Sequence, residues 1–309
     1  MALTAFSKDN ALNTLNRNYV DGLASIPDDW RQIVDFTQEQ SGALRVTSMA
    51  SIGEVASWDG TADLNATATA AGSAGTKTID IAQFGAQVTI SRLNAQTIPG
   101  LVDGMARRMG VAVANTYRKQ VFTRLNQCAG SQVSGDGKAF FATDHTVPGG
   151  SGTRSNSITS ALDPAGIAAA IEATRGWVDS TGAPYDLSGG GFWLVVPYQL
   201  EEAARSAVAS PYTLTSVTSS GSPSQGLSNM VTQFMSQADI IVANVGITSD
   251  DNAWYLLPKL ANPLLAWERL SPVMRQVENS DDLSIRLTTD FALAVACNVE
   301  PAGIFSNPS

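Results

Sequence analysis

The longest helical pattern in the chain constrains its fold more than any other feature. Apolar or small residues recur at intervals of three and four after the sequence TIPG: Leu101, Met105, Met109, Ala112 and Thr116. The helical pattern continues to about Cys128, where the sequence AGSQVSGDGK ends it. A helix of about 28 residues is about 42 Å long, a length that suits a scaffold element.

Basic side chains gather on the other side of this predicted helix. At about 100° per residue, they fall within an arc of about 120° roughly opposite the apolar stripe. The residues of this basic face are Arg107, Arg108, Arg118 and Lys119. Such a face either contacts phosphates or acidic neighbours or is simply solvated, and both alternatives stay open.

Two segments with alternating polarity flank a stretch of small residues. IGEVASW at 52–58 and IDIAQFGAQVTIS at 79–91 alternate as strands do, and Leu64 is the only large apolar residue between them. We therefore expect a long hairpin over 52–91 with a mobile tip, which needs a partner because an isolated hairpin is marginally stable. The candidate contact residues are Glu54, Val55, Trp58, Lys77 and Phe84.

The N-terminal region, residues 1–51, is predicted to be an arm. In DDWRQIVDFTQEQ the residues Trp30, Ile33, Val34 and Phe36 fall on one side of a short helix. So little apolar area cannot stabilise an isolated segment. We expect Trp30, Ile33 and Phe36 to contact another part of the assembly.

The remaining sequence mixes helices and strands. It predicts helices after Asp163-Pro164, over PYQLEEAARSAVAS and around LSNMVTQFMSQA. Strands are predicted over GFWLVV, DIIVANV, AWYLLP, PLLAWERL and LSIRLTTDFALAVACNVEP. Without a regular strand-helix alternation, the fold class is α+β.

Composition narrows the classes of function. Charged residues make up 15% of the 309 residues, well below the roughly 25% of ordinary globular proteins, so we expect other subunits to cover part of the surface. A formal net charge of −9 argues against a dedicated nucleic-acid-binding domain. The longest apolar run, FALAVAC, is far short of the ~20 residues of a membrane span. With no secretory signal visible, we expect a soluble protein made in a cytoplasm.

The sequence contains few candidates for catalysis. Its only histidine, His145, follows Asp144 in the turn-like segment FFATDHTVPGG. A serine-histidine-acid triad would need His145 as its base, oriented by an acid distant in sequence. We expect instead a turn histidine that is hydrogen-bonded or in solvent, and we predict no cofactor.

The two cysteines, Cys128 and Cys297, lie far apart with no second metal ligand nearby. We expect buried free thiols, with a disulfide as the alternative that a reducing compartment disfavours.

The order of these segments resembles the major capsid proteins of tailed bacteriophages. The residues are similar to the Mu-like major head subunit family in particular. The similar segments are WRQIVDFTQEQSGA, IGEVASWDG, AQVTISRLNAQTIPGLVDGMARRMGVAVANTY, GFWLVVPYQLEEAAR, WYLLP and AWERL. ATDHTVP matches that family's Ala-Asp-His-Gly-Asn-Leu turn at Asp144 and His145 and departs from it in the following residues.

The resemblance implies the Hong Kong 97 fold. Its parts would be the N-terminal arm at 1–51, the extended loop at 52–91, a peripheral domain at 92–164 and 264–298, and an axial domain at 165–263 and 299–309. Identical subunits would form pentamers and hexamers that close into an icosahedral head around double-stranded DNA. The head would be assembled in the host bacterial cytoplasm, with portal, scaffold and decoration proteins as further partners and no membrane.

Two residue-level expectations and two alternatives accompany this resemblance. The basic face is expected to meet the lumen or a subunit boundary, and Lys77 is the one hairpin lysine that could crosslink to a neighbour. An encapsulin-type shell shares the fold and encloses enzyme cargo instead of DNA. A soluble hydrolase that uses His145 is an alternative of a different class.

Overall fold

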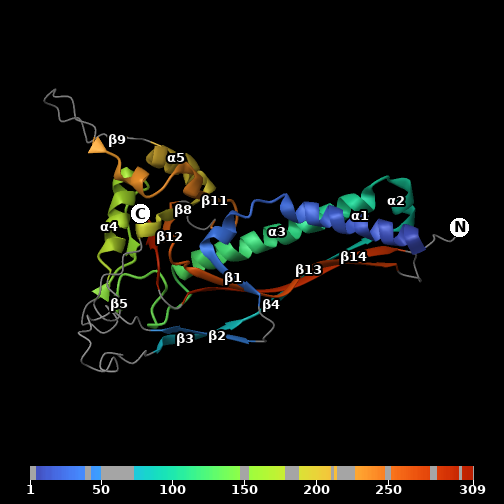
Figure 1. The fold of residues 1–309 in the computed structure, drawn as a ribbon, viewed down its shortest axis with the longest axis horizontal. Coiled ribbons are helices and arrows are strands. Elements are labelled where there is room, and N and C mark those ends of the chain that lie inside the picture. The colour runs from blue at the N-terminus through green and yellow to red at the C-terminus, as the bar shows by residue number, and fades with distance from the viewer. Residues whose placement is uncertain are drawn as a thin grey trace, which may run out of the picture.

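The computed structural model describes residues 5–38, 43–49, 73–146, 153–177, 188–209, 212–213, 227–247, 252–278, 284–298 and 301–308. Within these residues the chain forms an elongated body. A long helix and a long sheet run side by side along one part, and a second sheet with two helices gathers at the other end (Figure 1). The α+β prediction is confirmed.

The predicted scaffold helix is α3 (Leu101–Cys128), with the bounds that the sequence indicated. Gly100 precedes it with φ of 73°, a left-handed conformation that favours glycine. The buried row of α3 consists of every fourth residue: Met109, Val113, Tyr117, Val121 and Leu125. This row differs from the predicted stripe, because Ala112 is exposed.

A four-stranded sheet lies against α3. Its order is β1 (Val34–Gln38), β13 (Leu264–Glu278), β14 (Ile285–Cys297) and β4 (Ala82–Ile90). β1 is parallel to β13, and the other pairs are antiparallel. The rings of Tyr117 on α3 and Phe291 on β14 stack with 4.8 Å between their centroids, so the sheet covers the buried row of the helix.

The helix α1 (Ala5–Ala24) packs along the outer side of α3 (Figure 1). Two glycines permit the close approach. A Cβ built on Gly110 would lie 2.2 Å from the carbonyl oxygen of Tyr19, and one on Gly22 would lie 2.1 Å from that of Arg107. The phenol of Tyr19 exchanges a 2.8 Å hydrogen bond with the hydroxyl of Thr289. The N-terminal segment therefore contacts its own subunit.

The second sheet has five strands. Their order is β11 (Ile240–Ala243), β8 (Phe192–Pro197), β12 (Trp254–Pro258), β15 (Ile304–Ser306) and β7 (Ser157–Ile158). The helices α4 (Pro164–Arg175) and α5 (Glu201–Ala209) pack on it and contribute to a second core cluster. The carboxylate of Asp163 accepts a 2.7 Å hydrogen bond from the Gly166 amide, which caps α4 as the sequence predicted.

The remaining elements are short. They are η1 (Asp29–Ile33), α2 (Arg92–Thr97), β5 (His145–Thr146), β6 (Thr153–Arg154), η3 (Ser188–Gly190), η4 (Tyr198–Leu200), β9 (Tyr212–Thr213), β10 (Leu227–Ser228), η5 (Met230–Gln233) and η6 (Gln237–Asp239). The helix predicted over LSNMVTQFMSQA is wrong. Asn229 caps a first short turn at the Val231 amide, and Ser236 with Asp239 caps a second one, so local side-chain hydrogen bonds divide the segment.

The two sheets share one hydrophobic core. Residues of the second sheet such as Val195, Ile241 and Tyr255 belong to the same cluster as the buried row of α3. The phenol of Tyr255 hydrogen-bonds the side chain of Asn126 at 3.1 Å. The predicted division into domains, with boundaries at 164, 263 and 298, stays a prediction, although the sheets change close to those positions.

The predicted hairpin is displaced along the chain. β2 (Ala43–Met49) pairs with β3 (Ser73–Asp80), and β4 belongs to the four-stranded sheet as the partner of β14. The range 52–91 therefore begins too late and includes a strand of the body. β2, with the sequence ALRVTSM, lies before the predicted range.

Candidate functional site

The β2–β3 hairpin is the extension that a contact between subunits would use. Its base is held by Ile79, which is buried on the face of the four-stranded sheet opposite α3. The other buried members of this small cluster are Leu265, Trp267, Ala294 and Ala296. In Figure 1 the hairpin lies below the sheet as a separate ribbon.

The five predicted hairpin contacts have different outcomes. Glu54, Val55 and Trp58 lie outside the described residues. Lys77 lies in β3 opposite Val46, and its role as a contact stays a prediction. Phe84 lies in β4, where its ring stacks on Phe291 of the same chain at 5.2 Å, so its assignment to the hairpin is wrong.

The predicted arm contacts also lie within the subunit. Trp30 and Ile33 are buried in the main core, and Phe36 packs against it. The indole of Trp30 stacks on Tyr117 with 5.8 Å between ring centroids. These side chains are therefore not available to a neighbouring subunit, and that prediction is wrong. The predicted short helix is also wrong, because the segment forms the turn η1 and then the strand β1. The apolar residues indicate that the segment needs a cover, but the sequence does not say which surface supplies it.

One of the four residues predicted for the basic face is buried. Arg107, Arg108 and Lys119 are exposed on α3, whereas Arg118 is 9% exposed. Its guanidinium donates to Asp29 at 2.6 Å and to the Val242 carbonyl at 2.9 Å. Arg118 thus connects α3 to η1 and to β11, and the prediction that it belongs to an exposed face is wrong.

His145 is a buried structural residue. It is 0% exposed. Its Nδ1 lies 2.7 Å from the Asp136 carboxylate, and its Nε2 lies 3.1 Å from the Phe140 carbonyl oxygen. Both partners are hydrogen-bond acceptors, so both ring nitrogens are engaged within the subunit. The adjacent Asp144 pairs with Lys138 instead. The predicted hydrogen-bonded turn histidine is confirmed.

The environment of Asp136 favours its charged form. Burial alone would raise the pKa of this carboxyl, but hydrogen bonds from Ser134, from His145 and from the Lys138 amide outweigh burial and lower the pKa below its ordinary value. The cluster orders the loop that follows α3, and neither ring nitrogen of His145 is free to accept a proton from a substrate.

The cysteines are correctly predicted as buried and incorrectly predicted as free. Cys128, the last residue of α3, forms a disulfide with Cys297, the last residue of β14, and their Cα atoms are 6.2 Å apart. Both residues are 0% exposed. The pairing follows from the packing of α3 along β14, which the sequence spacing does not reveal.

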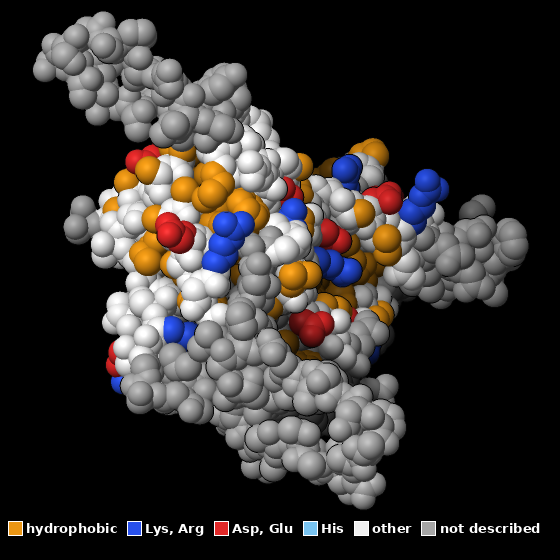
Figure 2. All heavy atoms as spheres, turned by 60° about the vertical axis from the view of Figure 1, so that its left-hand side comes forward, with side chains coloured by type: hydrophobic (Ala, Val, Ile, Leu, Met, Phe, Trp, Pro, Cys, Tyr) orange, Lys and Arg blue, Asp and Glu red, His pale blue; other side chains and the backbone are white. Residues whose placement is uncertain are grey.

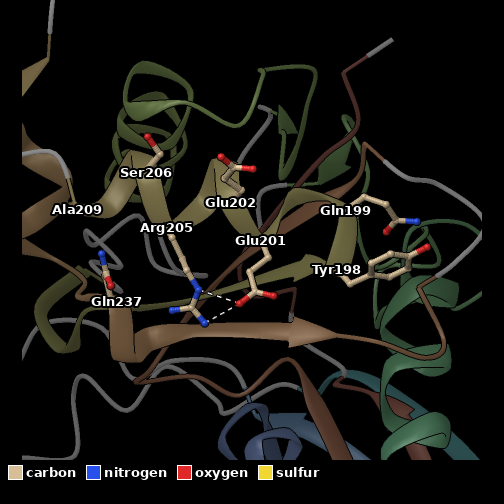
Figure 3. Close-up of a pocket in the computed structure, with 8 residues that line it drawn as sticks. All are labelled: Tyr198, Gln199, Glu201, Glu202, Arg205, Ser206, Ala209 and Gln237. Carbon is tan, nitrogen blue, oxygen red and sulfur yellow. Dashed lines mark hydrogen bonds and ion pairs between the residues drawn. The ribbon is translucent and has the colours of Figure 1, made fainter.

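Two hollows mark the described surface. One, of about 680 Å³, runs along α5, where the side chains of Glu201 and Arg205 point toward each other while Glu202 and Ser206 point away (Figure 3). The Arg205–Glu201 ion pair measures 2.8 Å. The other, of about 390 Å³, lies between α1, α3 and β13 above the buried Glu268. Neither hollow is lined by His145 or a cysteine.

Sequence reasoning missed a set of exposed apolar side chains. They include Leu93 in α2, Tyr198 in η4 and Leu260 before β13, which are 73%, 57% and 64% exposed. At the end with the second sheet, apolar side chains lie among charges of both signs, without a large field of one sign (Figure 2). The sequence contains one sign of this exposure, in the alternating pattern of β13. Val273 and Val277 lie on the exposed side of the strand, whereas Met274 is buried.

Within the described ranges, no group of three potential ligands could hold a metal ion. Among the same residues, no helix is both long and apolar enough to cross a membrane.

Solved structures with the same fold come from viral and virus-like shells. The procapsid of bacteriophage JBD30 is 15% identical with a TM-score of 0.55, over 99% of this chain and 77% of that one. The capsid of Ralstonia phage GP4 is 10% identical with a TM-score of 0.58, over 90% and 87%. A virus-like particle from Pyrococcus furiosus is 11% identical with a TM-score of 0.54, over 95% and 98%.

At these identities the similarity establishes the fold, which is the Hong Kong 97 fold. No curated protein matches the sequence. A family model described as phage capsid protein matches residues 73–307. Because the match covers well over half of the sequence, the chain belongs to the phage capsid protein family.

Proposed function

We propose that the chain is the major capsid protein of a tailed bacteriophage. Its role would be structural: copies of it assemble as pentamers and hexamers into an icosahedral head that encloses double-stranded DNA. The observation that carries the proposal is the family match over 73–307. Within the family, segments such as IGEVASWDG and GFWLVVPYQLEEAAR support a similarity to the Mu-like major head subunit group.

The β2–β3 hairpin supports assembly on physical grounds. Two strands alone are marginally stable in water, and Ile79 at the base of this hairpin is buried against the four-stranded sheet. Contact with a neighbouring subunit would supply the missing burial, so that part of the stability arises on assembly. We propose that Lys77 and the residues between β2 and β3, including Glu54, Val55 and Trp58, make this contact.

The exposed basic residues of α3 support a weak contact with DNA. We propose that Arg107, Arg108 and Lys119 face the lumen or a subunit boundary. There they would offset part of the −9 net charge near packaged DNA without reading its sequence.

The four-stranded sheet with α3 would form the peripheral domain, and the five-stranded sheet the axial domain. Portal and scaffold proteins would be further partners in the host cytoplasm, and the finished head part of the virion.

Electron microscopy of the purified chain over a range of salt concentrations tests the proposal. We expect closed shells, or pentameric and hexameric rings. A monodisperse monomer under all conditions, also after addition of a scaffold, would contradict a capsid role.

A deletion tests the hairpin separately. Removal of residues 60–78 should leave a folded subunit, because α3, the four-stranded sheet and the five-stranded sheet all lie outside this range. The variant is expected to have a normal circular dichroism spectrum and to fail to form closed shells. Normal shells from this variant would show that the hairpin is dispensable for assembly.

An encapsulin-type shell is the second candidate, because the virus-like particle from Pyrococcus furiosus shares the fold over 95% of this chain. The contents of particles from the native source distinguish the two. DNA of defined length supports a phage head, and a protein cargo without DNA supports a nanocompartment. The hydrolase alternative has lost its base, because both ring nitrogens of the buried His145 are engaged.

A further inference from the structure

The chain passes between its two sheets at three points that lie close together. It leaves α3 at Cys128 toward β7, enters β13 at Leu264 after β12, and leaves β14 at Cys297 toward β15. Leu264 and Cys297 are directly paired in the sheet. The amide of Asn298 donates a 2.7 Å hydrogen bond to the Pro263 carbonyl. The junction between the sheets is therefore concentrated around the two cysteines.

The disulfide ties two of these three passages together. Its cysteines are 169 residues apart in sequence, and the loop it closes contains the strands β7, β8, β11 and β12 of the second sheet. The Cα separation of 6.2 Å falls in the range that a disulfide bridges without backbone movement. The same folded junction therefore accommodates either two thiols or one disulfide.

We propose that Cys128 and Cys297 form a redox lock on the junction between the two sheets, open in the newly folded chain and closed afterwards by a small peroxide. The closing step would begin when one thiol gives up its proton and its sulfur attacks a peroxide oxygen. The O–O bond breaks, the leaving oxygen takes up that proton, and the products are a sulfenic acid and one water. The second sulfur then displaces the sulfenic oxygen as a second water. Two thiols and one hydrogen peroxide become one disulfide and two water molecules.

Burial decides which reagents act on this lock. Because both residues are 0% exposed, a protein oxidant or glutathione cannot approach either sulfur in the folded chain, whereas hydrogen peroxide is little larger than water. The thiol-disulfide exchange that would reopen the bond needs a thiolate in line with the sulfurs. We therefore expect closure in the folded state and reopening only after local unfolding.

The closed lock resists unfolding because it restricts the unfolded chain. Closing a loop of this length lowers the equilibrium constant for unfolding by on the order of a thousandfold in the chain-entropy model. The effect belongs to the single subunit and does not require the proposed shell.

The test uses the full-length chain purified in reductant and then divided, with one half treated with hydrogen peroxide. Each half is denatured and labelled with a maleimide polymer, and guanidinium unfolding is measured on unlabelled samples. We expect two labelled thiols before peroxide and none after it, with the midpoint of unfolding shifted to higher guanidinium. The matched control is Cys297→Ala, which cannot close the lock and reports any effect of peroxide on the methionines.

Two results would overturn the proposal. One is that both thiols of the wild type still react after peroxide. The other is that the oxidised and reduced wild type unfold at the same midpoint after correction by the control. Dithiothreitol provides a further check: it should reopen the bond much faster in denaturant than in buffer, and equal rates would refute protection by burial.

Discussion

The close contact between α1 and α3 makes a prediction that opposes intrinsic helix propensity. Replacing a helical glycine by alanine ordinarily stabilises a helix by about 1 kcal/mol. At Gly110 the added Cβ would lie 2.2 Å from the Tyr19 oxygen and 2.8 Å from the Leu23 nitrogen. Both atoms are backbone, so no flexible side chain can yield. We predict that G110A destabilises the chain although alanine is the better helix former.

The expected loss of stability in G110A follows from how α1 responds to the added Cβ. Overpacking in a fixed structure costs about 1–3 kcal/mol. If α1 instead detaches, Leu15 and Tyr19, which are 5% and 3% exposed, lose their burial at about 2 kcal/mol each. The variant adopts whichever response has the lower free energy, overpacking with α1 docked or detachment of α1. The smaller of the two costs therefore determines the loss of stability. After the gain in propensity of about 1 kcal/mol, we expect a net loss of up to about 2 kcal/mol.

Gly104 provides the matched control on the same helix. A Cβ there would meet no atom within 4 Å, so G104A should stabilise the chain by up to about 1 kcal/mol. Guanidinium unfolding of the two variants and the wild type, with circular dichroism as the signal, compares the signs directly. If G110A proves as stable as G104A, α1 does not dock on α3 as described.

Two further predictions concern buried polar groups. Tyr117 donates a 2.6 Å hydrogen bond to the buried Glu268, and burial followed by that carboxylate raises the pKa of the phenol, so it stays a donor. Y117F should cost about 2 kcal/mol, against about 1 kcal/mol for Y19F, whose hydroxyl meets the neutral Thr289; equal losses in urea unfolding would contradict the reasoning. The lowered pKa of Asp136 adds stability above its ordinary pKa of 3.8, which is lost as pH falls through the folded value. The stability difference between wild type and D136N should therefore shrink in acid unfolding below pH 4, and a difference independent of pH would refute this assignment.

The elements that the sequence predicts well are those whose signal is local and long. α3 shows a helical period over the whole of its length, and the predicted ends agree with Leu101 and Cys128. β14 is similarly clear, because Leu287, Phe291 and Val295 lie on one face toward α3 and the core. In both cases the hydrophobic pattern repeats often enough to outweigh any single residue.

The errors arise where the partner of a segment decides its role. Alternation in the sequence indicates that Phe84 belongs to a strand. It does not indicate that this strand pairs with β14 of the body instead of with a strand of the hairpin. Trp30 and Ile33 were correctly identified as needing a cover, and the cover is α3 of the same chain. Arg118 belongs to a basic arc by its helical angle, yet Asp29, 89 residues earlier, turns it into a buried ion pair. Such long-range pairings have no local signature.

These corrections change where contacts between subunits are to be sought. The arm, Phe84 and Arg118 already contact groups within their own subunit, and moving them to a neighbour would expose the core that they cover. Two sets remain as candidates: the β2–β3 hairpin as the proposed extension, and exposed apolar side chains such as Leu93 and Leu260 on the described surface. Because the core is complete without either set, we expect a subunit that folds before it assembles. Assembly contacts then add to a stable monomer, which allows each one to be weak and therefore correctable while a closed shell forms.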